Sequence, residues 1–184
     1  MDHTDTLQLI LRSREGDALA VEALIRAHET RVYRLAVSML DDPAEADEAT
    51  QEAFIRAIER LDTFRGEASF ATWVYAIALN VCRGRLRKRR ARARLTQILR
   101  TLLRVESALL EDTAIDRESH DAVWNAIHAL DDKHREVIVL RYFHDLRQED
   151  IARVLGVTDR TVRARLSAAH TRLREVLKGS VDLE

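Results

Sequence analysis

The sequence contains few of the residues that form tight turns or that stabilise small folds covalently. Its 184 residues include one proline, five glycines and one cysteine, Cys82. Glycine and proline mark the turns between strands and short elements, so their scarcity favours helices. A single cysteine excludes an internal disulfide, and with it the class of disulfide-stabilised secreted domains.

Long apolar segments are also missing. No apolar run approaches the roughly 18 residues that would span a bilayer. The opening MDHTDTLQLI lacks the basic segment followed by an apolar stretch that characterises a secretory signal. We therefore expect a cytoplasmic protein that does not insert into a lipid bilayer.

No pattern of catalytic or metal-binding residues is visible. The histidines and Cys82 are not spaced as ligand sets, since His134 and His144 lie ten residues apart and Cys82 has no partner at metal-site separation. We find no phosphate-binding loop and no nucleophile motif. These observations disfavour an enzyme, and we expect no catalytic residue, no metal and no cofactor.

The sequence does contain helical periodicity. Hydrophobic residues make up 46% of the chain and charged residues 33%, which suits packed helices with charged outer faces. Apolar residues recur at helical spacing over 17–40, over 43–61 and from Phe70 onward, and no segment alternates convincingly as a strand would. Asp42 can cap the second of these helices, because Pro43 fits its first position.

A polar segment, DTAIDRESHD, divides the chain into two parts. We expect an all-α fold with two small helical domains, residues 1–94 and 121–184, joined by a linker over 95–120. Within the second domain, REVIVLRYF predicts a helix over 135–143, and the residues that follow form a helix-turn-helix pattern.

One block of positive charge lies at the end of the first domain. The stretch RGRLRKRRARAR, residues 83–94, contains eight Lys or Arg residues and no acidic one, although the whole chain has a formal charge of −1. Such a block fits either a solvated linker or a site for a polyanion, because clustered cations displace the counterions of nucleic acids. Its charge alone does not distinguish the two.

The linker carries an apolar stripe. Its spacing predicts an amphipathic helix, and an exposed stripe of this size would be an association site. We expect this segment to be helical and packed against the domains, holding them in a compact arrangement that hides DNA-binding surface. The stripe consists of Leu95, Ile98, Leu99, Leu102, Leu109 and Leu110.

The C-terminal motif is RQEDIARVLGVTDRTVRARLSAAHTRL. Ala152 lets two helices cross closely, Gly156 can take the positive φ of the corner, Thr158 can cap the second helix, and Val162 fills the core. An ordinary helical hairpin with a solvated basic face would show the same pattern. The arginines of the second helix favour a DNA reader, because a recognition helix must also contact phosphates; they are Arg160, Arg163 and Arg165.

Two features of the first domain have both a structural and a functional interpretation. Glu45, Glu48 and Glu52 form an acidic stripe, which is either a solvated face or a surface for docking a basic protein. Aromatic residues beside Arg65 suit single-stranded DNA, or they belong to the core, as we expect for Trp73. Asn80 is either a structural amide or a group that reads a base edge.

With these motifs in view, the chain resembles the bacterial RNA polymerase sigma factors of the extracytoplasmic-function group. The matching stretches are DPAEADEATQEAFIRAIERL, FRGEASFATWVYAIALN and REVIVLRYFHDLRQEDIARVLGVTDRTVRARL, in the order that the family shows. The resemblance implies a protein that binds the β′ clamp and β flap of core RNA polymerase, reads promoter DNA and is held by an anti-sigma factor.

The resemblance also implies residue roles. Polymerase docking would fall to Glu45, Asp47, Glu48, Gln51 and Glu52. The −10 element would be bound by Arg65, Phe70, Asn80, Arg83, Arg85 and Arg87. The −35 element would be read by Arg160, Arg163, Ala164, Arg165, Ser167 and Ala168.

One departure from the family concerns the −35 positions. Ala164 and Ala168 stand where the family often has a polar or basic residue, so −35 readout would depend on DNA shape or on Arg163. The alternative interpretation is a helix-turn-helix regulator that binds duplex DNA without polymerase. That alternative leaves the acidic stripe and the stretch from Phe64 to Asn80 without a role.

Overall fold

The computed structural model describes residues 3–103 and 121–181, and within these ranges every regular element is a helix. The first part contains α1 (His3–Arg14), α2 (Ala18–Leu40), α3 (Pro43–Glu59), a 3₁₀ turn η1 (Leu61–Thr63) and α4 (Phe70–Leu103). The second contains α5 (Asp121–Ala129), α6 (Asp132–Ile138), a π-helical turn η2 (Val139–Phe143), α7 (Gln148–Leu155) and α8 (Asp159–Val181). The predicted all-α class is confirmed.

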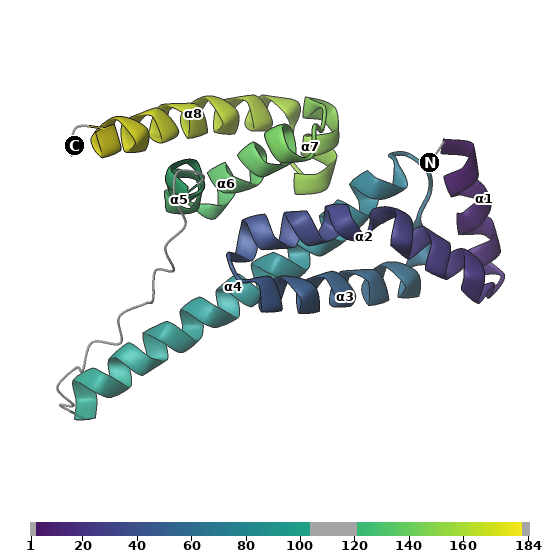
Figure 1. The fold of residues 1–184 in the computed structure, drawn as a ribbon, viewed down its shortest axis with the longest axis horizontal. Helices are drawn as coiled ribbons and strands as arrows, with labels where there is room; N and C mark the ends of the chain where they lie inside the picture. Colours follow the sequence, from purple (N-terminus) through teal and green to yellow (C-terminus); the bar gives the residue numbers. More distant parts are fainter. Residues whose placement is uncertain (1–2, 104–120, 182–184) are drawn as a thin grey trace.

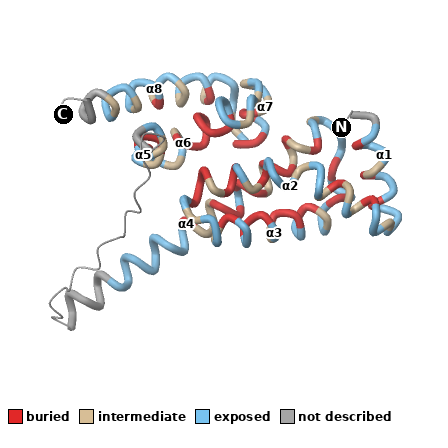
Figure 2. Tube along the Cα trace, in the orientation of Figure 1, coloured by how far each residue is buried: buried red, intermediate tan, exposed pale blue. Residues whose placement is uncertain are grey.

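Helices α2, α3 and α4 pack side by side, and α5–α8 form a second group on one side of them, while the end of α4 projects away from both (Figure 1). Figure 2 shows buried residues on the faces of α2, α3 and α4 that meet. Small buried residues of α3, among them Ala46, Ala49 and Ala53, allow the neighbouring helices to approach closely. Leu24 and Leu79 are fully buried between them.

Aspartates cap the first turns of α2 and α3, as was predicted for Asp42. The Asp17 carboxylate accepts hydrogen bonds from the amides of Leu19 and Ala20 at the start of α2. The Asp42 carboxylate accepts one from the Glu45 amide at 2.9 Å, with Pro43 in the first position of α3. Side-chain oxygens therefore satisfy N–H groups that have no partner inside the helix.

Helix α1 is an element that the sequence patterns did not predict. Ile10 is buried, and the Arg14 guanidinium donates hydrogen bonds to the carbonyl oxygens of Leu61 and Phe64. Through these bonds α1 fixes the segment that leads from α3 to α4.

The second group of helices is held together by an internal arginine. Arg135 is 9% exposed and donates to the carbonyl oxygens of Ile127 and Leu130, at the end of α5, and to that of Met39 in α2. The helix predicted over 135–143 is helical throughout, but its hydrogen bonding changes to a π-helical turn at Val139. Such turns interrupt the regular α-helical pattern.

Helix α4 passes through the basic block without a break and continues to Leu103, so the predicted boundary at residue 94 falls inside a helix. The expectation that the apolar stripe is packed is wrong at Leu95, whose side chain is 58% exposed. The other five residues of the stripe lie outside the described side chains. Among the described residues, no helix is long and apolar enough to cross a membrane, and no acidic, histidine or cysteine cluster could hold a metal ion.

Candidate functional site

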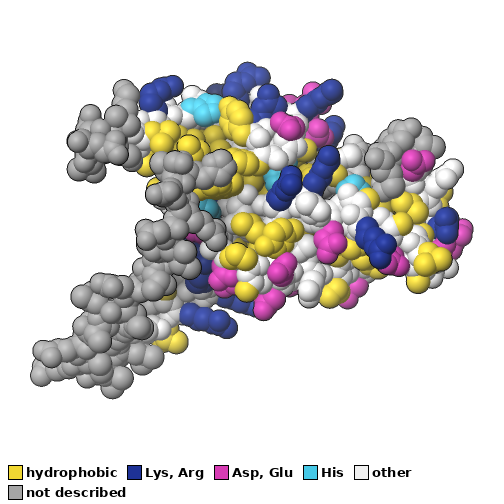
Figure 3. All heavy atoms as spheres, viewed as in Figure 1, with side chains coloured by type: hydrophobic (Ala, Val, Ile, Leu, Met, Phe, Trp, Pro, Cys, Tyr) yellow, Lys and Arg dark blue, Asp and Glu magenta, His cyan; other side chains and the backbone are white. Residues whose placement is uncertain are grey.

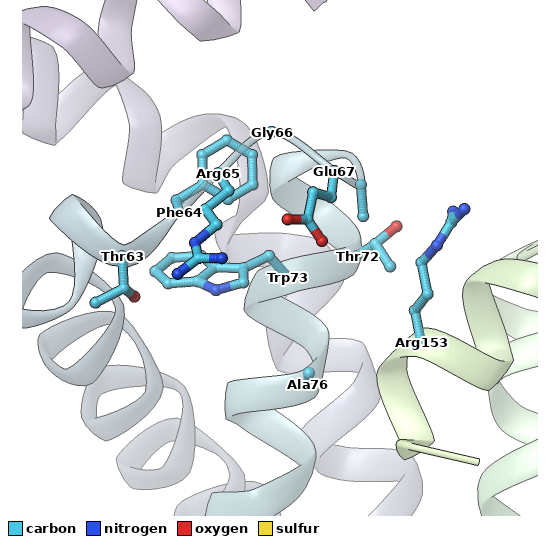
Figure 4. Close-up of a pocket in the computed structure, with 10 residues that line it drawn as sticks. Thr63, Phe64, Arg65, Gly66, Glu67, Thr72, Trp73, Ala76 and Arg153 are labelled. Atoms are coloured by element: carbon cyan, nitrogen blue, oxygen red, sulfur yellow. The ribbon is translucent and has the colours of Figure 1, made fainter.

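A pocket of about 290 Å³ opens where the loop before α4 meets the first turns of that helix (Figure 4). Gly66 has a φ of +74°, a left-handed conformation that glycine adopts easily, and it turns the loop over the pocket. The Ser69 hydroxyl accepts a hydrogen bond from the Thr72 amide and caps α4. The lining residues are Thr63, Phe64, Arg65, Gly66, Glu67, Ala68, Thr72, Trp73, Ala76 and Arg153.

The pocket rests on an aromatic cluster. The Phe64 ring lies 5.4 Å from that of Trp73 and 5.7 Å, edge to face, from that of Phe70. Phe70 is 2% exposed, so its ring supports the pocket from the core and does not face solvent as the predicted DNA contact would. Trp73 packs against the core, as predicted, and also lines the pocket.

Asn80 does not line this pocket. It is exposed on α4, and its side-chain oxygen accepts a hydrogen bond from Arg83 at 3.2 Å. It borders a separate polar groove of about 640 Å³ between α3 and α4, together with Arg85 and Arg87. The structure therefore brings Arg65 to the pocket but leaves Asn80 outside it.

Two of the predicted site classes meet in this groove. Arg85 donates to Glu48 at 2.8 Å and to Glu52 at 3.0 Å, so a residue expected to contact DNA is paired with two residues expected to contact a protein. The hydrogen bond to Glu48, together with that to Glu52, raises the pKa of Arg85. Glu45 is half-buried, while Asp47 is exposed.

Arg83 is also occupied. Its guanidinium makes two hydrogen bonds to the carboxylate of Glu136 in α6, at 2.6 and 2.7 Å, and these raise its pKa. Arg87 is exposed and makes no ion pair within the described residues. The arginines predicted for the −10 element therefore differ in how much of each is available to a ligand.

An apolar groove lies between α2 and α3. It has a volume of about 530 Å³ and is bordered by Ile25, Phe54, Ile55 and Ile58, with the exposed Gln51 at its edge. Ile55 is 60% exposed, and with the other apolar residues of the groove it forms a continuous apolar surface. The sequence analysis did not predict this groove. The close spacing of Phe54, Ile55 and Ile58 on one helix was the available signal.

The helix-turn-helix is formed by α7 and α8. Gly156 ends α7 with a φ of +66°, and the Thr158 hydroxyl accepts from the Thr161 amide at the start of α8. Val162 and Ala169 are buried against the rest of the domain. Of the predicted base-facing residues, Arg160, Arg163, Ala164 and Ser167 are exposed, and Arg165 and Ala168 are half-buried.

Basic side chains are visible along the α8 side of the surface (Figure 3). Arg160, Arg163 and Arg165 form no ion pair with any described residue. The Gln148 amide donates to the Asp159 carbonyl at 2.9 Å and ties the first helix of the motif to the second. The start of α8 is thus a basic surface held by a rigid pair of helices.

The comparisons with known proteins agree with this arrangement. Residues 24–92 match Sigma-70 region 2, and residues 126–175 match Sigma-70 region 4. The ECF RNA polymerase sigma factor SigW of Bacillus subtilis is 31% identical over 177 residues, covering 92% of this chain and 95% of that protein. The RNA polymerase sigma-H factor of Pseudomonas aeruginosa is 31% identical over 184 residues, covering 93% of each.

A solved structure of CnrH in complex with the cytosolic domain of CnrY superposes with a TM-score of 0.69 at 25% identity, covering 95% of this chain and 97% of that one. The region 2 match covers the polar groove, the apolar groove and all of the pocket except Arg153, and the region 4 match covers Arg153 and most of the helix-turn-helix. The chain therefore belongs to the ECF RNA polymerase sigma factors, which bind core RNA polymerase and direct transcription initiation at promoters.

Proposed function

We propose that three surfaces of the chain divide this function. The pocket and the adjoining face of α4 take the −10 element, the start of α8 reads the −35 element, and the groove between α2 and α3 docks on the polymerase. The observation that carries the proposal is the pocket beside Arg65 and Trp73, which lies at the start of the helix that contains the basic block. On this proposal the protein acts by binding rather than catalysis, and it works in the cytoplasm.

The pocket suits an unpaired base. The half-buried Trp73 offers an aromatic ring for stacking, and Arg65 is exposed at the rim. Base stacking on aromatic rings holds single strands with little sequence preference, while nearby cations hold the backbone. Arg87 extends the cationic surface along α4, and Phe70 contributes by holding the aromatic cluster in place.

At the −35 element, we assign base recognition mainly to Arg163. It is exposed, whereas Ala164 and Ala168 have no hydrogen-bonding side chain and are limited to apolar contacts such as the thymine methyl. Arg160 and Ser167 are exposed beside it and suit contacts to phosphates. We therefore expect one strongly specified base pair and weaker preferences around it.

We assign the β′ clamp contact to the apolar groove with Gln51 and Asp47, because Glu48 and Glu52 are partly engaged by Arg85. Ile55→Glu should reduce affinity for core polymerase by roughly 2 kcal/mol or more, about thirtyfold, as for an interface hot spot. Leu19→Glu, at an exposed leucine outside the groove, is the matched control. Equal affinities of the two variants in a fluorescence titration with core enzyme would refute the assignment.

The β flap contact fits the exposed aromatic surface of the second domain. Phe143 and Tyr142 are exposed, and the Phe143 ring lies 4.6 Å from that of Trp124. Regulation by an anti-sigma factor is a further part of the proposal, supported by the superposition on a structure in which CnrH is bound to the cytosolic domain of CnrY.

The direct test is transcription with reconstituted polymerase over a library of genomic fragments. The chain should direct initiation at discrete start sites, and Trp73→Ala should reduce promoter melting, measured by permanganate reactivity of unpaired thymines, while core binding is retained. Asn80→Ala tests the other predicted −10 residue in the same assay. Normal melting in Trp73→Ala would remove the pocket from the proposal.

A further inference from the structure

The basic face of α4 lies against the acidic face of α6. Besides the Arg83–Glu136 pair, the Arg90 guanidinium makes two hydrogen bonds to the Asp132 carboxylate, at 2.7 and 2.8 Å. Asp132 and Glu136 are four residues apart, so they share one face of α6. Both carboxylates therefore come from the −35 domain and both guanidinium groups from the helix of the −10 domain.

These pairs have the geometry with which arginine binds DNA phosphates. A guanidinium forms two parallel hydrogen bonds equally well with a carboxylate or with a phosphate. Glu136 is 2% exposed, so in this arrangement Arg83 cannot be reached by a phosphate from the side that Glu136 occupies. A given guanidinium face holds either the protein carboxylate or the nucleic acid.

Other contacts place the second domain over the same side of the first. The Tyr75 ring lies 4.9 Å from that of His144, and Arg135 donates to the Met39 carbonyl. Arg153, from the first helix of the helix-turn-helix, lines the pocket on the side opposite Thr63 (Figure 4). The contact between the domains thus reaches from the basic block to the edge of the base pocket.

We propose that α6 is an internal competitor for promoter DNA, in which Glu136 and Asp132 occupy Arg83 and Arg90 until core polymerase separates the domains. This inference rests on the proposed DNA-facing role of α4. It differs from the expected effect of the apolar linker stripe, because the carboxylates of α6 now perform the masking. The −35 helix stays uncovered, so the masking acts on the −10 surface.

Such a contact is suited to being reversible. Removing two charges from water costs nearly as much as their attraction returns, so a half-buried ion pair adds little net stability. Exchange of a carboxylate for a phosphate leaves the number of hydrogen bonds to arginine unchanged. A ligand that binds only the separated state can therefore shift the population without breaking a strong interface.

The test uses the full chain and a short, fluorescein-labelled single-stranded DNA of mixed sequence, with affinity measured by anisotropy. Replacing both carboxylates, by Glu136→Gln and Asp132→Asn, should tighten binding about tenfold, because each change leaves an arginine of the closed arrangement without its charged partner and so raises the binding-competent fraction. The matched control replaces two exposed acidic residues outside the contact, Glu15→Gln and Glu175→Gln, with the same change in charge. Equal affinities of the two double variants would overturn the proposal.

Two further measurements keep the result interpretable. Asp132→Asn alone changes a side chain that is 24% exposed, so the domain should stay folded, and about threefold tighter binding is expected; affinity equal to that of Glu175→Gln would overturn the proposal. Arg83→Ala on the polymerase-bound chain tests the underlying role of α4. If Arg83→Ala weakens DNA binding on polymerase but the carboxylate variants do not tighten it in the free chain, only the competition is refuted. If Arg83→Ala does not weaken DNA binding on polymerase, the DNA-facing role of α4 itself is refuted.

Discussion

Helices α4 and α8 carry the same kind of residue for the same kind of ligand, yet their arginines are in different states. On α4, Arg83 and Arg90 are paired with carboxylates of the other domain, and Arg85 is paired with carboxylates of its own. At the start of α8, Arg160 and Arg163 are exposed and form no ion pair with the described residues. A count of positive charges would not show which of these arginines are paired.

The difference shows that the availability of a basic surface depends on packing as much as on sequence. Arg85 is paired within its own domain, so on the proposed mechanism it would remain paired when the domains separate, whereas Arg83 and Arg90 would be released. On this proposal the −10 surface of the free chain is masked in part, while the −35 surface is open to DNA. The following predictions test this contrast in order of decreasing effect.

Acid should separate the two domains and leave Arg83 and Arg90 of α4 as accessible as the arginines at the start of α8. Burial, and then the charges of Arg31 and Arg34, lower the pKa of His144 to about 4, while Asp145 opposes the shift. When the domains separate, the His144 imidazole returns to a pKa near 6.5 and binds a proton more readily. The contact between the domains therefore loses stability as pH falls from about 6.5 to about 4, by up to roughly 3 kcal/mol.

Energy transfer between labelled domains, followed from neutral pH downward, measures this effect. His144→Phe should flatten the profile, because phenylalanine cannot take up a proton, and the fold should tolerate it because the buried ring nitrogen Nε2 has no hydrogen bond to lose. His170→Phe, at an exposed histidine, is the control and should leave the profile intact. A profile unchanged in His144→Phe would point instead to His128, whose pKa burial also lowers.

Loss of base recognition at α8 should be the next largest effect. Arg163→Ala should cost roughly 1–3 kcal/mol at one base position if the guanidinium is bidentate to a guanine. Because α8 is uncovered, the loss should be the same in the free chain and on polymerase. Arg174→Ala, further along the helix, should give only a small loss shared by all sequences, and an equal pattern for the two variants would mark Arg163 as a phosphate contact.

Unlike Arg163, Arg83 should contribute differently to DNA binding in the free chain and on polymerase. In the free chain, Arg83→Ala should reduce binding to single-stranded DNA less than it does on polymerase, because loss of the Arg83–Glu136 pair also loosens the contact between the domains and offsets the lost phosphate contact. On polymerase, the same change should reduce the slope of log affinity against log salt by about one phosphate contact. Equal effects in both states would mean that Arg83 is not masked.

The smallest effect should be at the far end of α4. Leu95→Gln should leave the free energy of unfolding within about 0.5 kcal/mol of the original, because the side chain is exposed and has little packing to lose. Leu79→Gln, which is fully buried on the same helix, should be strongly destabilising in the same denaturant titration. A large loss at Leu95 would restore the packed linker that the sequence suggested.

Features determined by neighbouring residues were predictable from the sequence. The caps at Asp42 and Thr158 and the corner at Gly156 depend on short-range hydrogen bonds and backbone preferences, and all were predicted. Helix α1 was missed because much of its stabilisation is tertiary, through Ile10 and the bonds from Arg14 to residues some fifty positions away.

The site was less predictable than the fold, because pairing between distant charges cannot be read from spacing. The family resemblance implied that Arg83 and Arg85 contact DNA and that Glu48 docks on polymerase, but it did not indicate that Arg85 and Glu48 bind each other or that Arg83 binds Glu136. The apolar groove at Ile55 was not predicted, because Ile55 lies in the apolar run AFIRAI and the sequence does not show which of these side chains remain exposed.

The central claim is that the two domains are in contact in the free chain and separate on polymerase. It is tested most directly by single-molecule energy transfer between dyes at Ala27→Cys and Asn125→Cys, two exposed positions, one in each domain. Burial raises the pKa of the Cys82 thiol to about 12, so that cysteine should remain unlabelled. The account predicts one narrow distance distribution in the free chain and a different one with core polymerase; the same distribution in both states would contradict it.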